Sequence, residues 1–180
     1  MEANSLPGSN RSAQTWVVTR DTSALLDFVT ETFGATEIAR VPTEDGGIGH
    51  AEFVIGDTWL LAFDAQPDWP ATPAMLRVFV DDATATFARG VAAGAEVITE
   101  LDDAAWGDRG GRLRDPLGNI WWVIQHVEDV SPEEMNRRFS EPRYARSMER
   151  AQQTLDTAMT GKRTGWSSAP VVERAPGGGS

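Results

Sequence analysis

Hydrophobic residues recur along this chain with two periods, and the two periods alternate in a fixed order. Residues 14–20 are rich in β-branched and aromatic side chains and predict a strand. Residues 24–33 carry apolar side chains three or four positions apart, which is typical of a helix with one buried face. Asp21-Thr22-Ser23 supplies an N-cap for this helix, and Gly34 ends it. Three more strands are predicted over residues 36–41, 48–55 and 58–64.

The same order of elements returns in the second half of the chain. A strand is predicted over residues 75–80, a helix over 83–93 and another strand over 96–101. Residues 106–114 and 120–126 predict a hairpin, because the segment 115–119 between them, Asp-Pro-Leu-Gly-Asn, has the composition of a tight turn.

The two halves align at an offset of 60 residues. Asp21 then lies opposite Asp81, and Gly34-Ala35 lies opposite Gly94-Ala95. Each half is a β-α-β-β-β module, and one module alone cannot cover both faces of its sheet. We therefore expect an α+β fold in which two modules form one curved mixed sheet, with helices outside and a concave cleft for a ligand.

A helical arm follows the second module. Ser131-Pro-Glu-Glu134 has the residues of a helix start, and Pro142 divides the arm into two helices. From residue 143 onward one apolar stripe continues, which predicts a face that packs on the acidic body or on a second subunit. The stripe consists of Tyr144, Met148, Ala151 and Leu155. The predicted divisions of the chain are a disordered leader (1–12), module 1 (13–66), a linker (67–73), module 2 (74–130), the arm (131–160) and a disordered tail (161–180).

Charge and cysteine content narrow the classes of partner. The net charge of −11 disfavours binding to nucleic acid or to anionic membranes, and it permits cationic ligands. Residues 1–136 hold 8 Arg against 23 acidic residues, whereas residues 137–180 hold 7 Arg and 1 Lys against 4 acidic residues. The chain has no cysteine, no long apolar run and no secretory signal pattern, so we expect a cytoplasmic protein without disulfides.

Several segments resemble the vicinal oxygen chelate superfamily, also called the glyoxalase/bleomycin resistance/dioxygenase fold, and within it the PhnB-like group. The resemblance covers about residues 14–135. It implies the two-module fold and, by analogy with relatives, a homodimer, but it does not imply one activity. The segments that carry it are Gly49 to Thr58, Val80 to Phe87 with Gly94-Ala95, Trp106 to Arg109, Arg114 to Asn119 and His126 to Met135.

The same resemblance predicts that the family's metal site is absent. Metalloenzymes of the family place His or Glu on the first and last strands of each module. Ala and Trp cannot coordinate a divalent cation, so we expect neither a metal nor another cofactor. The four corresponding positions are Gln14 (or Thr15), Ala62, Met75 and Trp122.

Alternation along the strands predicts which side chains face the cleft. On the strand 58–64 we expect Leu60, Ala62 and Asp64 to face it, and on the strand 75–80 Met75, Arg77 and Phe79. Tryptophan is frequent, with 7 Trp against 1 Tyr, and its rings stack on flat molecules and attract cations. The expected ligand-binding residues are Trp16, His50, Glu52, Leu60, Asp64, Met75, Arg77, Phe79, Trp106, Arg112 and Trp122.

Three functions are compatible with these residues. The first is a metal-independent protein that binds a small aromatic natural product or drug. The negative charge of the protein permits this ligand to be cationic. The second is a metal-independent isomerase, cyclase or lyase that uses His50 or Glu52 as its base. The third is a metal-dependent lyase or dioxygenase with shifted ligands, again His50 and Glu52.

Overall fold

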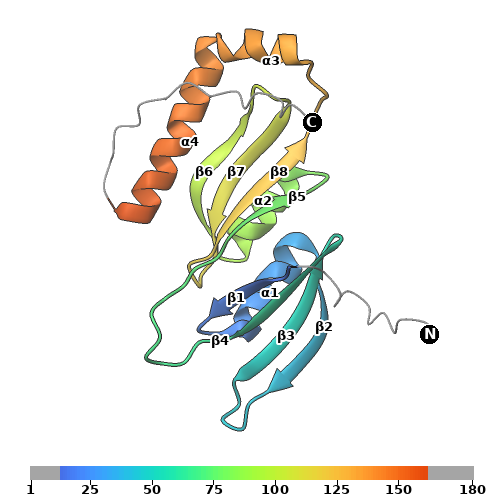
Figure 1. Ribbon diagram of the computed structural model, residues 1–180, viewed down its shortest axis with the longest axis vertical. Helices are drawn as coiled ribbons and strands as arrows, with labels where there is room; N and C mark the ends of the chain where they lie inside the picture. The colour runs from blue at the N-terminus through green and yellow to red at the C-terminus, as the bar shows by residue number, and fades with distance from the viewer. Residues whose placement is uncertain (1–12, 162–180) are drawn as a thin grey trace, which may run out of the picture.

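The computed structural model describes residues 13–161, so the predicted leader and nearly all of the predicted tail lie outside the described residues. The first module consists of β1 (Thr15–Thr19), α1 (Thr22–Phe33), β2 (Thr36–Pro42), β3 (Ile48–Ile55) and β4 (Thr58–Asp64). The second consists of β5 (Met75–Phe79), α2 (Ala83–Ala92), β6 (Glu96–Asp103), β7 (Asp108–Arg114) and β8 (Ile120–His126). The arm contains α3 (Pro132–Phe139) and α4 (Pro142–Thr160) (Figure 1).

Each module builds its own four-stranded sheet, and the two have the same topology. The strand orders are β1-β4-β3-β2 and β5-β8-β7-β6, with the first and last strands of each module parallel and the other neighbours antiparallel. The expected α+β fold with two β-α-β-β-β modules and a helical arm is confirmed. One detail of that expectation is wrong, because the strands form two separate sheets rather than one continuous sheet.

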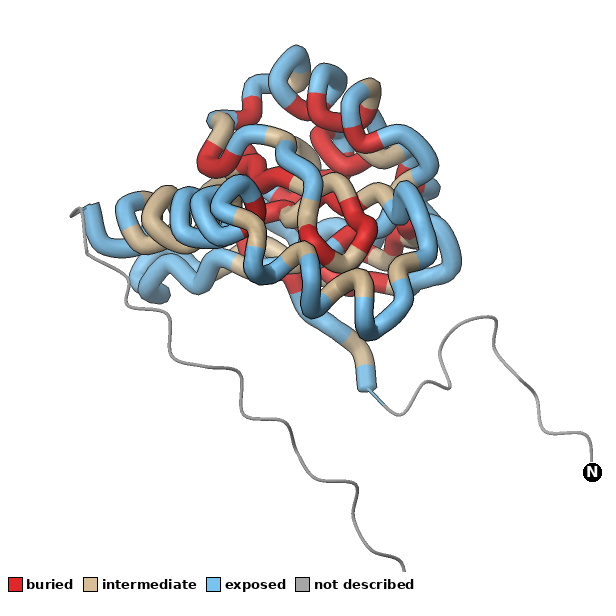
Figure 2. Tube along the Cα trace, turned by 90° about the horizontal axis from the view of Figure 1, so that it is seen from above, coloured by how far each residue is buried: buried red, intermediate tan, exposed pale blue. Residues whose placement is uncertain are grey.

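One hydrophobic core joins the two modules. The ring of Trp121, on β8, is fully buried and lies 5.1 Å from the ring of Phe33 and 6.3 Å from that of Phe28, both on α1. Arg89 on α2 adds a hydrogen bond from its Nε to the carbonyl oxygen of Thr32 on α1. Removal of a large aromatic ring from a core typically costs about 3–5 kcal/mol, so these contacts hold the halves together strongly. Figure 2 shows the buried segments gathered inside the molecule.

The helix caps correct the predicted alignment of the two modules. Asp21 accepts a hydrogen bond from the amide of Ala24, and Asp82, not Asp81, accepts the equivalent bond from Ala85. The modules therefore align at an offset of 61 residues at the start of each helix. The last strands keep this offset, because Trp16 pairs with Leu61 as Arg77 pairs with Trp122.

This one-residue difference reverses the predicted faces of β4. Leu60 and Ala62 belong to the buried core beneath the helices, and Asp64 accepts hydrogen bonds from the amides of Thr22 and Ile48. Leu60, Ala62 and Asp64 therefore face the helices, and the prediction that they face a cleft is wrong. A shift of one residue exchanges the two faces of a strand, which explains the error.

Other strands also turn one set of side chains toward the core. On β3 the side chains of Ala51, Phe53 and Ile55 are buried in the core, as the alternation predicts. On β7 Leu113 is fully buried, and on β5 Val78 is buried.

The turn between β7 and β8 depends on the side chain of Asp115. Its two carboxylate oxygens accept hydrogen bonds from the amides of Leu117 and Asn119, from the Asn119 side chain and from the Trp121 indole. All of these donors lie 2.9 Å away. The carboxylate is buried, and this full set of donors replaces the water it loses.

The arm lies against its own second module. Ser131 caps α3 by accepting a hydrogen bond from the amide of Glu134, as the sequence predicts. α4 then runs along β6, which gives the apolar stripe a surface within the same chain (Figure 1). None of the helices between residues 13 and 161 combines the length and the apolar character that crossing a bilayer requires.

Candidate functional site

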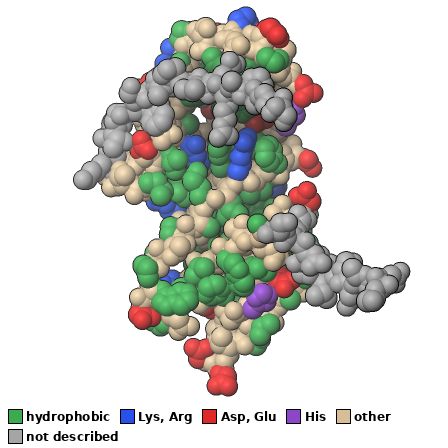
Figure 3. All heavy atoms as spheres, in the orientation of Figure 1, with side chains coloured by type: hydrophobic (Ala, Val, Ile, Leu, Met, Phe, Trp, Pro, Cys, Tyr) green, Lys and Arg blue, Asp and Glu red, His purple; other side chains and the backbone are tan. Residues whose placement is uncertain are grey.

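A cavity lies between the open face of the second sheet and the helix α4. It contains about 590 Å³ of empty space, solvent at its mouth included. Figure 3 shows this half of the molecule with basic side chains set among hydrophobic ones. The lining residues that matter for its chemistry are Thr99, Trp106, Asp108, Arg112, Trp122, Ile124, Tyr144 and Met148.

The floor of the cavity is kept open by a glycine of β7. A Cβ atom at Gly110 would lie 2.5 Å from Ile124 Cδ1 and 3.1 Å from the Trp122 Nε1 atom. Both distances are shorter than ordinary van der Waals contact, so a side chain here would displace the cavity wall.

Trp122 lies between two guanidinium groups. The carbon at the centre of the Arg77 guanidinium is 4.8 Å from the centre of the ring, and that of Arg112 is 4.7 Å from it. Arg77 also lies 4.7 Å from the ring of Phe79. Stacked arginines of this kind are attracted by the negative face of an aromatic ring.

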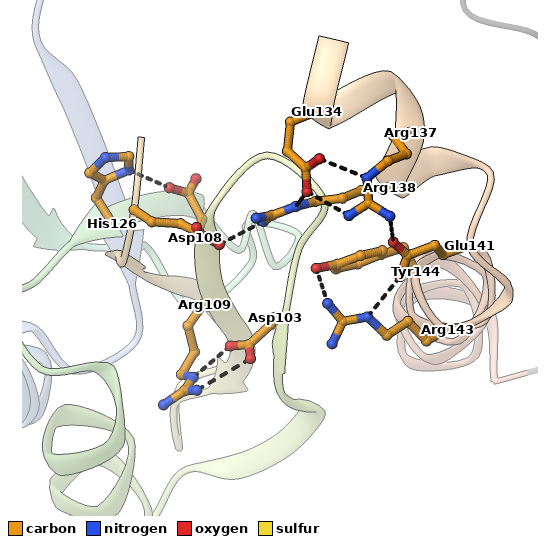
Figure 4. A network of polar contacts seen from close by, with 11 residues as sticks. Asp103, Asp108, Arg109, His126, Glu134, Arg137, Arg138, Glu141, Arg143 and Tyr144 are labelled. Carbon is orange, nitrogen blue, oxygen red and sulfur yellow. Dashed lines mark hydrogen bonds and ion pairs between the residues drawn. The ribbon is translucent and has the colours of Figure 1, made fainter. Parts of the chain in front are cut away.

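Asp108 connects the cavity to the end of β8. Its Oδ2 accepts hydrogen bonds from Trp106 Nε1 at 2.8 Å and from Arg77 at 3.0 Å, and its Oδ1 lies 3.1 Å from His126 Nδ1 (Figure 4). The other ring nitrogen of His126 lies 3.1 Å from Asp129. The hydrogen bond to Asp108, followed by that to Asp129, raises the pKa of His126 above its usual range.

Arg112 is a deeply buried positive charge on the wall. Its Nη1 donates to Thr99 Oγ1 at 3.2 Å and to the backbone oxygen of Ala151 on α4 at 2.7 Å. The second bond fastens α4 over the cavity, and Arg114 makes a similar bond to the carbonyl of Ala158 at 2.7 Å. Burial lowers the pKa of Arg112.

The arm adds an aromatic wall that is held by ion pairs. Tyr144 is 3% exposed, and the Arg143 guanidinium lies 4.1 Å from its ring centre. Glu134 forms ion pairs with Arg137 and Arg138, and these hydrogen bonds lower the pKa of Glu134 to about 2 (Figure 4). Glu134 is therefore ionised at any physiological pH.

A second group of the predicted residues lies on the first sheet, away from this cavity. The ring of Trp16 lies 5.4 Å from that of His50 and 5.2 Å from that of Phe63. His50 Nε2 lies 3.1 Å from Glu52 Oε1, so the two form a pair on this face. Glu52 and Arg112, both expected to bind the ligand, thus lie on two separate surfaces, one on each sheet.

The remaining predicted residues lie outside both groups or at their edge. Met75 and Phe79 are exposed on β5, an edge strand of the second sheet, and neither lines the cavity. Leu60 and Asp64 face the helices, as described above. The structure thus brings Trp106, Arg112 and Trp122 together around the cavity.

Several cavity residues were not predicted from the sequence. Asp108 follows Trp106 by two positions and so points to the same side of a strand, which is a signal that alternation could have given. Tyr144 and Met148 belong to the predicted apolar stripe, but nothing in the sequence showed which surface the stripe covers.

One of the four positions that correspond to metal ligands of the family has to be reassigned. The residue equivalent to Trp122 is Leu61, not Ala62, and a leucine side chain cannot coordinate an ion either. Within residues 13–161, no three His, Cys, Asp or Glu side chains are grouped so that they could hold a metal ion.

Comparison with known proteins agrees with this architecture. Residues 11–123 match the sequence profile of the Glyoxalase/Bleomycin resistance protein/Dioxygenase superfamily. An uncharacterized protein of Mycobacterium bovis is 33% identical over 135 residues, which are 69% of this chain and 89% of that protein.

Solved structures give the same result for the fold. TioX from Micromonospora sp. ML1 is 26% identical, with a TM-score of 0.54 over 64% of this chain and 99% of that one. The PhnB protein from Bacillus cereus is 15% identical, with a TM-score of 0.51 over 64% of this chain and 99% of that one. The predicted resemblance is thereby confirmed, and the chain belongs to the glyoxalase/bleomycin resistance protein/dioxygenase superfamily.

Proposed function

We propose that this protein binds a small aromatic molecule in the cavity between the second sheet and α4. The observation that carries the proposal is the wall formed by Trp106, Trp122 and Tyr144, three aromatic residues from a strand end, a strand and the arm. Ligand sites are usually concave, mainly apolar and equipped with a few polar groups. The cavity has these properties.

Membership of the superfamily supports a ligand cleft without choosing one reaction, because the fold hosts both enzymes and binding proteins. We place binding without turnover first, since the described residues that line the cavity include no pair arranged as a nucleophile and its base. A natural product or a drug is the expected kind of ligand.

The pair on the first sheet supports the alternative of a metal-independent isomerase, cyclase or lyase. Glu52 lies 3.1 Å from His50 and can orient the imidazole as a general base, beside the ring of Trp16. The second alternative, a metal-dependent lyase or dioxygenase, would need these two residues plus further ligands from outside the described chain.

We also propose that two copies of the chain associate through the open face of the first sheet. Trp16 and Trp69 are 43% and 45% exposed there, and Phe63 lies between them with its ring 5.2 Å and 6.0 Å from theirs. Exposed aromatic clusters of this kind commonly mark interaction surfaces. Figure 3 shows the hydrophobic area on this half of the molecule.

Ligand capture by the purified full-length protein tests the proposed function. Mass spectrometry of the native protein should detect a bound aromatic compound, and tryptophan fluorescence should follow its rebinding. Trp122→Leu should weaken binding by roughly fivefold, because the loss of an aromatic edge contact costs about 1 kcal/mol beyond the buried area. Trp69→Leu, in the segment between β4 and β5 and away from the cavity, is the matched control and should leave affinity unchanged.

The fate of the compound separates the alternatives. Recovery of the ligand unchanged supports a binding protein. Conversion that is lost in His50→Ala would instead establish the metal-independent enzyme. One equivalent of bound transition metal in elemental analysis would establish the metal-dependent one.

A further inference from the structure

We propose that the ligand of this cavity carries an anionic group, and that Arg112 is the residue that binds it. This inference rests on the proposed binding function and specifies its ligand as an aromatic carboxylate. It replaces the cationic ligand that the overall acidity of the chain suggested.

Arg112 carries a buried charge that nothing in the described chain neutralises. The residue is 7% exposed, and its two hydrogen-bond acceptors, Thr99 and the Ala151 carbonyl, are both uncharged. Among residues 13–161 its Nε has no hydrogen-bond partner, and the residue forms no ion pair there.

Other arginines on the same sheet are paired. Arg77 contacts Asp108 at 3.0 Å, Arg114 contacts Glu96 at 3.1 Å, and Arg109 contacts Asp103 at 2.8 Å. These three are more exposed than Arg112, so water also screens their charge. The three more exposed arginines therefore have carboxylate partners. The buried guanidinium of Arg112 has none among residues 13–161.

A guanidinium stays ionised in a protein, so burial does not remove the charge. The ring of Trp122, 4.7 Å away, compensates it in part, but a cation–π contact on one face leaves the N–H edge free. Arg112 lines the cavity, and its Nε is buried without a hydrogen-bond partner among residues 13–161. A carboxylate is the group that matches a guanidinium edge, because its oxygens accept charge-assisted hydrogen bonds.

The surrounding residues explain why the anion must belong to an aromatic molecule. Trp106, Tyr144 and Met148 form the apolar part of the wall and would contact its body. The carboxylate of Asp108 is already occupied by three donors. Glu100 and Asp102, exposed on β6 at the rim, are screened by solvent, and Arg150 lies 3.8 Å from Asp102.

A cationic ligand is disfavoured by the same geometry. Both Arg77 and Arg112 lie within 5 Å of the ring of Trp122, at 4.8 Å and 4.7 Å. A third cation would have to approach two fixed positive charges to reach that ring.

Three probes of one shape test the charge preference: 2-naphthoate, the neutral 2-naphthamide and the cationic 2-naphthylmethylammonium. Titration calorimetry on the full-length protein should show naphthoate binding roughly tenfold or more tightly than the amide, as expected for a hydrogen bond to a charged group. The ammonium compound should bind most weakly. Equal affinity for the acid and the amide would overturn the proposal.

The variant Arg112→Met keeps the length of the side chain and removes its charge. It should abolish the preference for naphthoate over naphthamide, while Arg112→Lys should keep part of it. Arg114→Met is the matched control, since Arg114 also bonds to an α4 carbonyl but is paired with Glu96 and does not line the cavity. It should keep the full preference.

The outcomes separate this inference from the proposed function. If Arg112→Met does not fold, the ranking of the three probes on the unaltered protein decides. If naphthamide binds as tightly as naphthoate, the cavity takes aromatic ligands and the anionic group is refuted. If none of the three probes binds, while mass spectrometry finds no aromatic ligand either, the proposed function itself fails.

Discussion

At the scale of single residues, Asp108 shows how one buried carboxylate organises the edge of the site. It holds the indole of Trp106, the guanidinium of Arg77 and the imidazole of His126 together. Of these three donors, only the imidazole changes its charge near neutral pH. Protonation of His126, which lies outside the cavity, is therefore coupled to the positions of Trp106 and Asp108, which line it.

We predict that His126 stabilises the fold at acidic pH and loses this effect as pH rises. Its folded pKa is raised above the usual value of 6.5, first by Asp108 and then by Asp129. A raised pKa means that the folded state binds the proton more tightly, so the gain is complete below about 6.5 and disappears above the folded pKa. Thermal melts of His126→Gln should show a larger loss of Tm at pH 6 than at pH 9.

The variant Asp129→Asn removes the exposed partner of His126 and should lower its pKa toward the usual value in an NMR titration. A Tm difference between the unaltered protein and His126→Gln that is the same at both pH values would show that the imidazole charge has no role.

The sequence predicted single cavity residues where one strand face was clear. Arg112 lines the cavity as expected from the alternation of Arg112, Leu113 and Arg114, whereas Trp122 lies in a continuous apolar run and is assigned by its correspondence to a family metal-ligand position. Leu60 and Asp64 were placed on the wrong side because β4 is apolar on both faces, so alternation there carries no signal. The role of Asp115 was predictable only as turn chemistry, and its contact with the Trp121 indole required the structure.

At the scale of elements, the two modules are alike in their caps and strand orders but not in their spacing. The turn between β3 and β4, residues 56–57, is three residues shorter than the turn between β7 and β8, residues 115–119. A single offset therefore cannot align all the elements.

We predict that Asp82, and not its neighbour Asp81, caps α2. Its carboxylate accepts the Ala85 amide at 2.9 Å, whereas Asp81 makes no such bond. Asp82→Ala should lower the free energy of unfolding by about 1 kcal/mol, the usual value of an N-cap. Asp81→Ala, exposed beside it, should change it by less than about 0.5 kcal/mol. Urea denaturation of both variants measures the difference, and equal losses would mean that the cap is shared.

The sequence predicts the two helices of the arm but not the surface on which they dock. Ser131, Pro132 and Pro142 fixed its two helices in the prediction, because capping and proline chemistry are local. Its docking on β6 depends on Arg112 and Arg114 reaching carbonyl oxygens of α4. Such contacts join residues about 40 positions apart in the chain, and no local pattern encodes them.

At the scale of the whole molecule, the two sheets present different surfaces. The second sheet is covered in part by α4, and the cavity lies beneath that helix. The first sheet has no such cover from the described chain, so its aromatic residues remain exposed.

We predict that the exposed face of the first sheet is where two copies of the chain meet. Trp16 is 43% exposed and in ring contact with both His50 and Phe63, so a charge at this position would disrupt an apolar interface without disturbing the core. In analytical ultracentrifugation the unaltered protein should sediment as a dimer. The variant Trp16→Glu should sediment as a monomer or show a dimer dissociation constant that is raised roughly a hundredfold, because an aromatic anchor of the interface is lost.

Val91→Glu provides the matched control for this experiment. Val91 is 45% exposed, but it lies on α2, away from the first sheet, so its variant should sediment like the unaltered protein. A monomer in both variants and in the unaltered protein would refute the interface. A dimer that survives Trp16→Glu but dissociates in Val91→Glu would place the contact on the helices. In either case the pair formed by His50 and Glu52 would lie on an open surface rather than in a site completed by a second subunit. The alternative of a metal-independent enzyme would then lack an enclosed site that excludes water from its general base.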